Sequence, residues 1–213
     1  AEDFRIFWDN AYGIHHLYED KQDYLIEILM ECKKAGNPDM VYKFSSTSKI
    51  SFPGSGIAAM AASDANLEDI RSTMRVQTIG HDKVNQLRHV RFFGDIHGIV
   101  EHMKKHADIL RPKFETVLEV LERELGGLEI GSWIAPRGGY FISFDALDGC
   151  AKAIVAKAKE AGAGATFPYG KDPHDSNIRI APSYPTPEEL AVAAEVFVLS
   201  VKLASVDKIL ETK

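Results

Sequence analysis

Residues 40–56 read Met-Val-Tyr-Lys-Phe-Ser-Ser-Thr-Ser-Lys-Ile-Ser-Phe-Pro-Gly-Ser-Gly, and this stretch decides the fold. Its first part, Met40–Phe44, is mainly apolar and rich in β-forming residues, which predicts a short strand. The polar residues 45–49 that follow are unsuited to a core, and Pro53-Gly54 then turns the chain. The stretch therefore predicts a strand that opens into a polar loop at its carboxyl end.

Strand and helix patterns alternate on both sides of this stretch. The apolar run Phe4–Trp8 predicts a buried strand that ends at Asp9. Alternating strands and helices are typical of an α/β fold with a mainly parallel sheet. Because a buried strand seldom opens a domain, we also expect further chain upstream. The elements predicted in this part are strands over residues 4–8, 40–44 and 57–62 and helices over residues 20–32, 67–74 and 84–93.

A long helical pattern leads from this part into a second one. It covers residues 98–125 and ends at Gly126-Gly127. A helix of this length often bridges two domains, so we expect a boundary inside it, with domains over residues 1–105 and 106–213. The pattern beyond the helix is typical of a compact α+β unit. Its predicted elements are strands over residues 140–144, 165–167 and 177–180 and helices over residues 147–161 and from Pro187 onward.

The composition limits the class of protein. Apolar residues make up 45 % and charged residues 26 % of the 213 positions, as in an ordinary folded domain. The net charge of −6 argues against nucleic acid or an anionic membrane as a partner. Cys32 and Cys150 have neither disulfide-scaffold nor zinc-site spacing, so we expect reduced thiols and no metal. Neither a signal peptide nor a membrane span is predicted, and we expect a cytoplasmic protein.

Two polar features lie at predicted strand ends, where ligands of open α/β sheets collect. They are Asp9 and the loop that contains Lys49. A desolvated lysine can attack a carbonyl as a free amine, and an aspartate can hold a pyridinium nitrogen protonated. A lysine in a serine-rich loop is, however, most often a solvated charge. The residues taken singly leave both interpretations open.

Four motifs in one order extend the interpretation. They are Asp9-Asn10-Ala11-Tyr12, then Ser46-Thr47-Ser48-Lys49 with Pro53-Gly54, then Pro136-Arg137-Gly138-Gly139-Tyr140-Phe141, then Asn177-Ile178-Arg179-Ile180. Together they resemble the carboxyl-terminal part of the fold-type I pyridoxal-phosphate aminotransferases, and most closely the group of aspartate aminotransferases and MocR-like aminotransferases. The resemblance implies the second part of a mainly parallel-sheet, cofactor-binding large domain over residues 1–105. A small α+β domain over residues 106–213 would follow it.

The resemblance also implies roles for residues of the first part. Lys49 would form the covalent link to pyridoxal 5′-phosphate and then move a proton of the substrate. Asp9 would pair with the pyridine nitrogen and keep it protonated, and Tyr12 would donate a hydrogen bond to the phenolic oxygen of the cofactor. Ser46 and Ser48 would lie at the phosphate. The alternatives are a tyrosine packed near a strand end and an ordinary polar loop.

In the second part, the resemblance assigns Arg179 to the α-carboxylate of the substrate, for which a planar guanidinium is well suited. The alternative is an arginine in a structural salt bridge. One position departs from the pattern, because many relatives have a phosphate-binding arginine where this chain has Gly56. Backbone amides of the turn at residues 54–56, or a residue upstream, would then have to neutralise the phosphate.

Two histidine pairs need separate consideration. In His15-His16, neighbouring side chains point in different directions, so we expect at most one of them to approach the site. His102 and His106 are four positions apart, a spacing that permits metal binding, but the residue order of a zinc protease is missing. We therefore expect these two to be surface histidines.

The predicted reaction is the exchange of an amino group between an α-amino acid, with aspartate as the first to test, and a 2-oxo acid such as 2-oxoglutarate. The resemblance further implies a homodimer. Two other functions stay open from the sequence: an aminotransferase-like effector domain of a MocR-type transcription regulator, and a non-catalytic fragment that serves as an interaction module. A helix-turn-helix domain upstream would favour the regulator.

Overall fold

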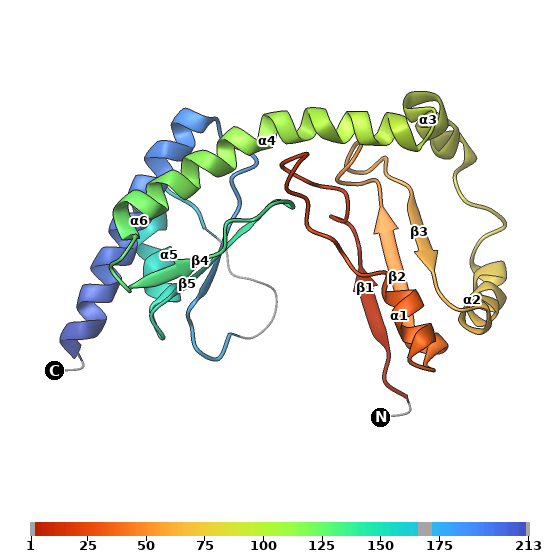
Figure 1. The fold of residues 1–213 in the computed structure, drawn as a ribbon, viewed down its shortest axis with the longest axis horizontal. Coiled ribbons are helices and arrows are strands. Elements are labelled where there is room, and N and C mark those ends of the chain that lie inside the picture. The colour runs from red at the N-terminus through yellow and green to blue at the C-terminus, as the bar shows by residue number, and fades with distance from the viewer. Residues whose placement is uncertain (1–2, 166–171, 212–213) are drawn as a thin grey trace. The chain divides into compact units, whose positions relative to one another are not determined.

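A computed structural model describes residues 3–165 and 172–211 of the chain (Figure 1). The chain forms two compact units. The first unit consists of Ala1–His16 and Gln22–Lys104, and the second of Leu17–Lys21 and Lys105–Lys213. The short segment Leu17–Lys21 is thus part of the second unit although both of its neighbours in the sequence belong to the first. The mixed α/β character agrees with the predicted fold class.

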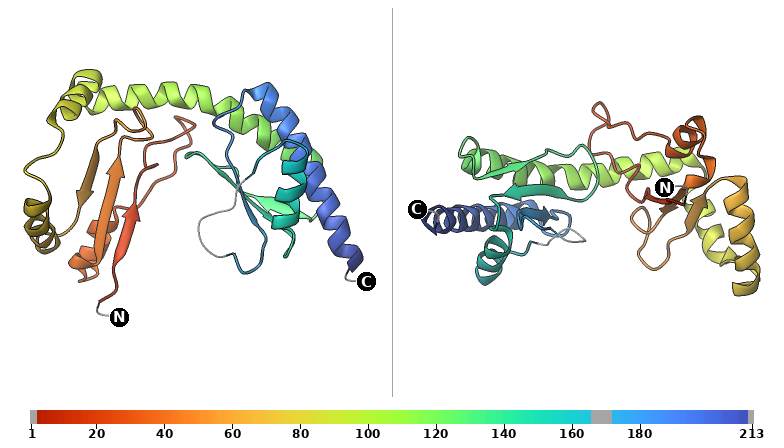
Figure 2. Two further views of the ribbon diagram at one scale, coloured as in Figure 1. Left: turned by 180° about the vertical axis from the view of Figure 1, so that it is seen from behind. Right: turned by 90° about the horizontal axis from the view of Figure 1, so that it is seen from below.

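The first unit contains a three-stranded sheet in the order β1 (Ile6–Asp9), β2 (Val41–Ser46), β3 (Ala58–Ala61), shown from behind in Figure 2. β1 and β2 are parallel, whereas β2 and β3 are antiparallel. The prediction of parallel pairing is therefore wrong for β3. The reason is the short connection between β2 and β3, since a parallel crossover needs a dozen or more residues, usually with a helix.

The faces of β1 are not buried as predicted. Its residues alternate between half-buried and exposed, and the Phe7 side chain is 72 % exposed. The ring of Phe7 stacks on those of Tyr42 and Phe44, at centroid distances of 5.5 and 5.9 Å. The face of β1 that carries Phe7 is therefore aromatic and exposed in this chain. The alternation of half-buried and exposed residues along β1 is the period of two that is typical of a strand.

Helices follow β1 and β3 in the first unit. The predicted helix over residues 20–32 is wrong in its first half, because α1 covers only Ile28–Lys34. Glu27 caps it by accepting a hydrogen bond from the Met30 amide, while Tyr24 and Leu25 upstream are exposed and have no core to pack on. The later helices of this unit are α2 (Asp64–Gln77), α3 (Lys83–Phe93) and the first part of α4, which covers Ile96–Leu125 as a whole.

The second unit contains the antiparallel sheet β4 (Gly131–Trp133), β5 (Ile142–Ala146), β6 (Asn177–Ile180) in that order, with helices α5 (Ala151–Glu160) and α6 (Pro187–Glu211). β4 is absent from the sequence prediction, because three residues are too few to show a period. The predicted strand over residues 165–167 falls mostly outside the described residues, and Ala165 itself is not in a strand.

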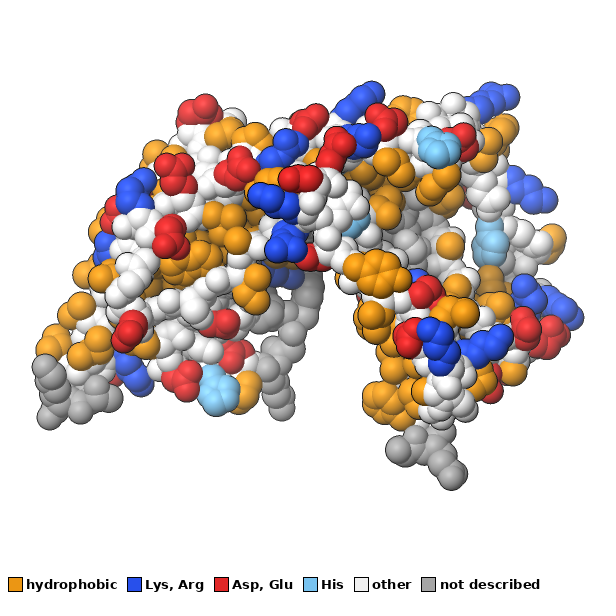
Figure 3. All heavy atoms as spheres, viewed as in Figure 1, with side chains coloured by type: hydrophobic (Ala, Val, Ile, Leu, Met, Phe, Trp, Pro, Cys, Tyr) orange, Lys and Arg blue, Asp and Glu red, His pale blue; other side chains and the backbone are white. Residues whose placement is uncertain are grey.

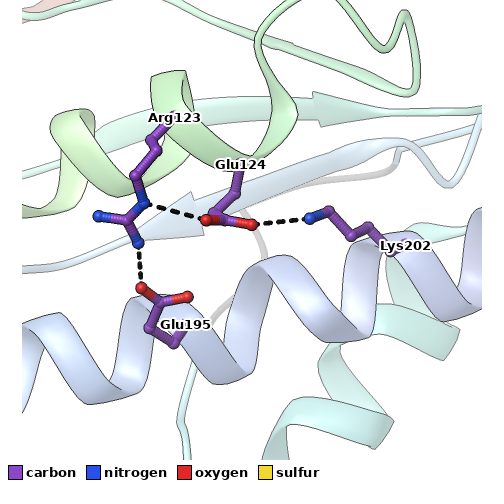
Figure 4. A network of polar contacts seen from close by, with 4 residues as sticks. All are labelled: Arg123, Glu124, Glu195 and Lys202. Atoms are coloured by element: carbon purple, nitrogen blue, oxygen red, sulfur yellow. Dashed lines mark hydrogen bonds and ion pairs between the residues drawn. The ribbon is translucent and has the colours of Figure 1, made fainter.

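The core of the second unit forms around Phe144, which is fully buried. Its ring lies 6.1 Å from that of Trp133 and 5.2 Å from that of Phe197, and a side chain at Gly131 would collide with it. Charged residues join α4 to α6 at the surface above this core (Figure 4): Arg123 pairs with Glu195, and Lys202 with Glu124 at 2.8 Å.

Hydrophobic side chains also reach the surface along α6, as Figure 3 shows in orange. Within residues 3–165 and 172–211, no helix combines the length and the apolar character that a membrane crossing requires.

Candidate active site

The site is built at the carboxyl ends of the two parallel strands. Asp9 is the last residue of β1 and is in register with Phe44 of β2, and the next amide, of Asn10, donates to the Phe44 carbonyl at 2.8 Å. Because residues in register point to the same side of a sheet, Asp9 shares its face with Phe44 and, two positions further on, with Ser46. The sheet thus presents a carboxylate and a hydroxyl on one face at one edge.

The loop after β1 reaches the turn that carries Lys49. The His15 Nε2–H donates to the Lys49 carbonyl at 3.0 Å, and the His15 ring meets the Tyr12 ring edge-on at 5.3 Å. His15 itself is buried. Tyr12 and Lys49, predicted from two separate motifs, therefore lie on two loops that are in direct contact, and Asp9 ends the strand that leads into the first of them.

Lys49 lies in a tight turn between strands β2 and β3. The Thr47 carbonyl accepts hydrogen bonds from the amides of Ile50 and Ser51, at 3.0 and 2.8 Å. The Ile50 side chain is buried in a small cluster with Phe93 and Met103, whereas Lys49 is exposed. The turn thus anchors one residue in the core and presents its neighbour, the lysine, to the outside.

Helices α3 and α4 support this turn with two further histidines. His89 Nε2 lies 2.8 Å from Thr47 Oγ1 and 3.0 Å from Ser51 Oγ. The His102 Nε2–H donates to the Ile50 carbonyl at 2.9 Å. His102 is half-buried, so its interpretation as a surface histidine is wrong. His106 is half-buried as well.

His89 is absent from the sequence prediction, although the sequence contains a signal for it. Asn85, His89 and Phe93 follow one another at intervals of four, which places them on one face of α3, and all three are buried. Polar residues on a buried helix face need partners, so this pattern points to a polar contact. Which residues supply the partners depends on the tertiary structure.

Gly56 packs directly on Ser48. A Cβ atom at Gly56 would lie 2.7 Å from Ser48 Oγ, 3.0 Å from its amide nitrogen and 3.1 Å from its Cα. An arginine is therefore excluded from this position unless the lysine turn moves. The side-chain amide of Asn85 also donates to the Ser55 and Gly56 carbonyls, at 2.7 and 3.2 Å. The glycine is needed for close contact of the two ends of the loop.

Arg179 belongs to the second unit. It lies in β6 in register with Ser143, and its guanidinium carbon is 4.4 Å from the centre of the Phe141 ring. Stacking on an aromatic ring restrains the guanidinium plane, and a planar guanidinium is suited to a planar anion. The contact connects two of the four sequence motifs.

The residues of the first unit suit pyridoxal phosphate chemically. An amine and a phenol lie on two touching loops, a carboxylate and a serine hydroxyl lie at the ends of the strands that precede these loops, and Gly56 packs on Ser48 without a side chain of its own. Burial is the main cause that lowers the pKa of the His15 imidazole below its ordinary 6.5, so the ring beside the lysine turn is neutral at neutral pH. A neutral ring adds no positive charge next to Lys49.

Solved structures place this architecture in the α/β aminotransferase fold. An aspartate transaminase from Corynebacterium glutamicum superposes with a TM-score of 0.91 at 41 % identity, over 97 % of this chain and 50 % of that one. An α-aminoadipate aminotransferase from Thermus thermophilus shares the fold at a TM-score of 0.74 and 19 % identity, over 94 % of this chain and 50 % of its own.

The family follows from the sequence match. Residues 1–213 match the model of the aspartate aminotransferase family, and the chain belongs to this family. It is 42 % identical to an aspartate aminotransferase of Corynebacterium glutamicum, over 97 % of this chain and 49 % of the relative. A protein of Mycolicibacterium smegmatis is 44 % identical over 100 % of this chain and 51 % of its own length. The chain thus spans about half the length of these relatives.

Proposed function

We propose that the protein containing this chain is a pyridoxal-phosphate-dependent aminotransferase that exchanges an amino group between an α-amino acid and a 2-oxo acid. Aspartate and 2-oxoglutarate are the first pair to test. The observation that carries the proposal is the contact between the loop after β1 and the lysine turn, in which His15 donates to the Lys49 carbonyl. It brings the residues of two separate motifs to one sheet edge.

Bound pyridoxal phosphate supplies an aldehyde for the amine and a protonated ring that accepts electrons from the substrate. Lys49 would hold the cofactor through its Nζ atom, and the same atom would take the proton from the substrate α-carbon and return it. Asp9 would keep the ring nitrogen protonated by its negative charge, and Tyr12 would orient the ring through its hydroxyl. Ser46 and Ser48 would hold the phosphate with their hydroxyls.

In the second unit, Arg179 would bind the α-carboxylate of the substrate. Its stacking on Phe141 supports this role, because a restrained guanidinium loses less freedom when it forms two parallel hydrogen bonds. We assign residues 1–105 to the second part of the large domain and residues 106–213 to the small domain. We further propose a homodimer, which the family supports, and a location in the cytoplasm.

Borohydride reduction of the complete protein with pyridoxal phosphate, followed by peptide mass spectrometry, tests the function. We expect one stable cofactor adduct, on the peptide that contains Lys49, and none in the Lys49→Ala variant. Lys83→Ala, at the exposed start of α3, is the matched control and should retain the adduct. An adduct that persists on another lysine in Lys49→Ala would overturn the assignment, and its absence from the unmodified protein would overturn the function.

A further inference from the structure

Three imidazoles from three separate segments hold the lysine turn. His15 comes from the loop after β1, His89 from α3 and His102 from α4, and they contact Lys49, Thr47 with Ser51, and Ile50 respectively. These contacts join residues 34, 42 and 52 positions apart for the pairs with Lys49, Thr47 and Ile50. Two of them go to backbone carbonyls, which only accept, so those ring nitrogens carry hydrogen.

The third imidazole, His89, differs because it contacts side chains. Its Nδ1–H donates to the Asn85 backbone carbonyl at 2.9 Å, so in the tautomer with hydrogen on Nδ1 alone Nε2 is an acceptor. The hydroxyl of Thr47 then donates to His89 Nε2, while Thr47 Oγ1 accepts from the Ile57 amide at 2.9 Å. The Thr47 hydroxyl thus links the helix, the start of the lysine turn and the first residue after the loop.

The contact of His89 restricts the conformation of the lysine turn more than an apolar residue at the same position would. His89 is buried, and a leucine of similar size would fill the space without needing a partner. The imidazole nitrogen instead requires a donor, and the turn provides one when the Thr47 hydroxyl faces α3, because the Ser51 hydroxyl, 3.0 Å from Nε2, donates to the Thr47 carbonyl. The conformation that satisfies His89 is therefore the conformation in which Lys49 projects away from the core.

We propose that His89 is a positioning residue for Lys49, acting through the hydroxyls of Thr47 and Ser51. The inference rests on the proposed function for the role of the lysine, but not for the contact itself. The buried imidazole selects one arrangement of the turn, and the reactive amine is presented at a fixed place beside the loop that follows Asp9 and carries Tyr12. No substrate or cofactor contact of His89 is required.

The test compares His89→Gln with His89→Leu in the complete protein. The terminal amide oxygen of glutamine restores an acceptor near the Nε2 position, whereas leucine keeps the volume and removes the acceptor. Amide hydrogen exchange of Ile50 and Ser51, measured without cofactor, should speed up by about tenfold in His89→Leu, the factor that corresponds to roughly one lost hydrogen bond. His89→Gln should remain close to the unmodified protein, and so should His97→Leu on the exposed start of α4.

The second readout is the rate at which pyridoxal phosphate forms its borohydride-stable adduct. We expect His89→Leu to slow adduct formation several-fold at an unchanged final stoichiometry, with Thr47→Val behaving like it and Thr47→Ser like the unmodified protein. Equal exchange and equal rates in His89→Leu and His89→Gln would overturn the positioning role. Failure of the unmodified protein to form an adduct would instead overturn the proposed function, since the exchange experiment does not depend on the cofactor.

Discussion

Substitution of Gly56 by alanine tests whether the lysine loop is closed as tightly as the structure shows. The new Cβ would meet Ser48 at three atoms, two of them in the backbone, at 2.7 to 3.1 Å. Backbone atoms cannot rotate away, so the loop from Thr47 to Ile57 must widen. Crowding of this kind lowers the free energy of unfolding by about 1–3 kcal/mol, whereas alanine raises it by about 0.4–1 kcal/mol because it restricts the unfolded chain. The expected net loss is about 1–2 kcal/mol.

The assay is urea unfolding of the complete protein, followed by circular dichroism, with Gly80→Ala as the matched control. A Cβ atom at Gly80 would meet nothing within 4 Å, so only the effect on the unfolded chain remains there. We expect Gly80→Ala to be neutral or slightly stabilising. If Gly56→Ala is no less stable than Gly80→Ala, the close contact of Gly56 with Ser48 does not exist.

A double variant separates the two parts of the clash. Ser48→Ala removes the hydroxyl at 2.7 Å but leaves the backbone atoms at 3.0 and 3.1 Å, so it should recover only part of the loss in Gly56→Ala. The coupling between the two sites should therefore be favourable and smaller than the cost of Gly56→Ala alone. The same geometry predicts that an arginine introduced at Gly56 will not restore a family-type phosphate contact.

Two further predictions concern pH and the core. Because burial lowers the folded-state pKa of His15 below 6.5, the unfolded chain binds more protons, so stability should fall as the pH decreases from about 6.5 towards the folded-state pKa. Urea midpoints between pH 8 and pH 5 should show this slope weakened in His15→Gln, and an unchanged slope would contradict the assignment. Phe144→Ala should lower the free energy of unfolding by about 3–5 kcal/mol, because the Phe144 ring is fully buried. Phe52→Ala, at a position that is 75 % exposed, should change it little. Comparable losses in the two variants would show that Phe144 is not in the core.

Local patterns were sufficient for most elements of the chain. The strand over residues 177–180, the long helix ending at Leu125 and the helix starting at Pro187 lie where the patterns predict them. Periodicity and the signals at helix ends depend only on neighbouring residues, so they can be read without knowledge of the fold. The helix predicted from residue 20 onward failed for the complementary reason, because its first turns have apolar residues but no surface to bury them against.

The sequence by itself determined that an aspartate ends one strand, that a lysine follows the next, and that the two motifs occur in the order of an aminotransferase. The contact through His15 between the loops after these two strands, the support of the lysine turn by His89 and His102, and the close contact of Gly56 with Ser48 are visible only in the folded chain. For the three histidine contacts, the physical reason is the length of chain between the partners, which is 34, 42 and 52 positions. A buried polar residue shows in the sequence that it needs a hydrogen bond, but a partner tens of positions away is chosen by the packing of helices and strands.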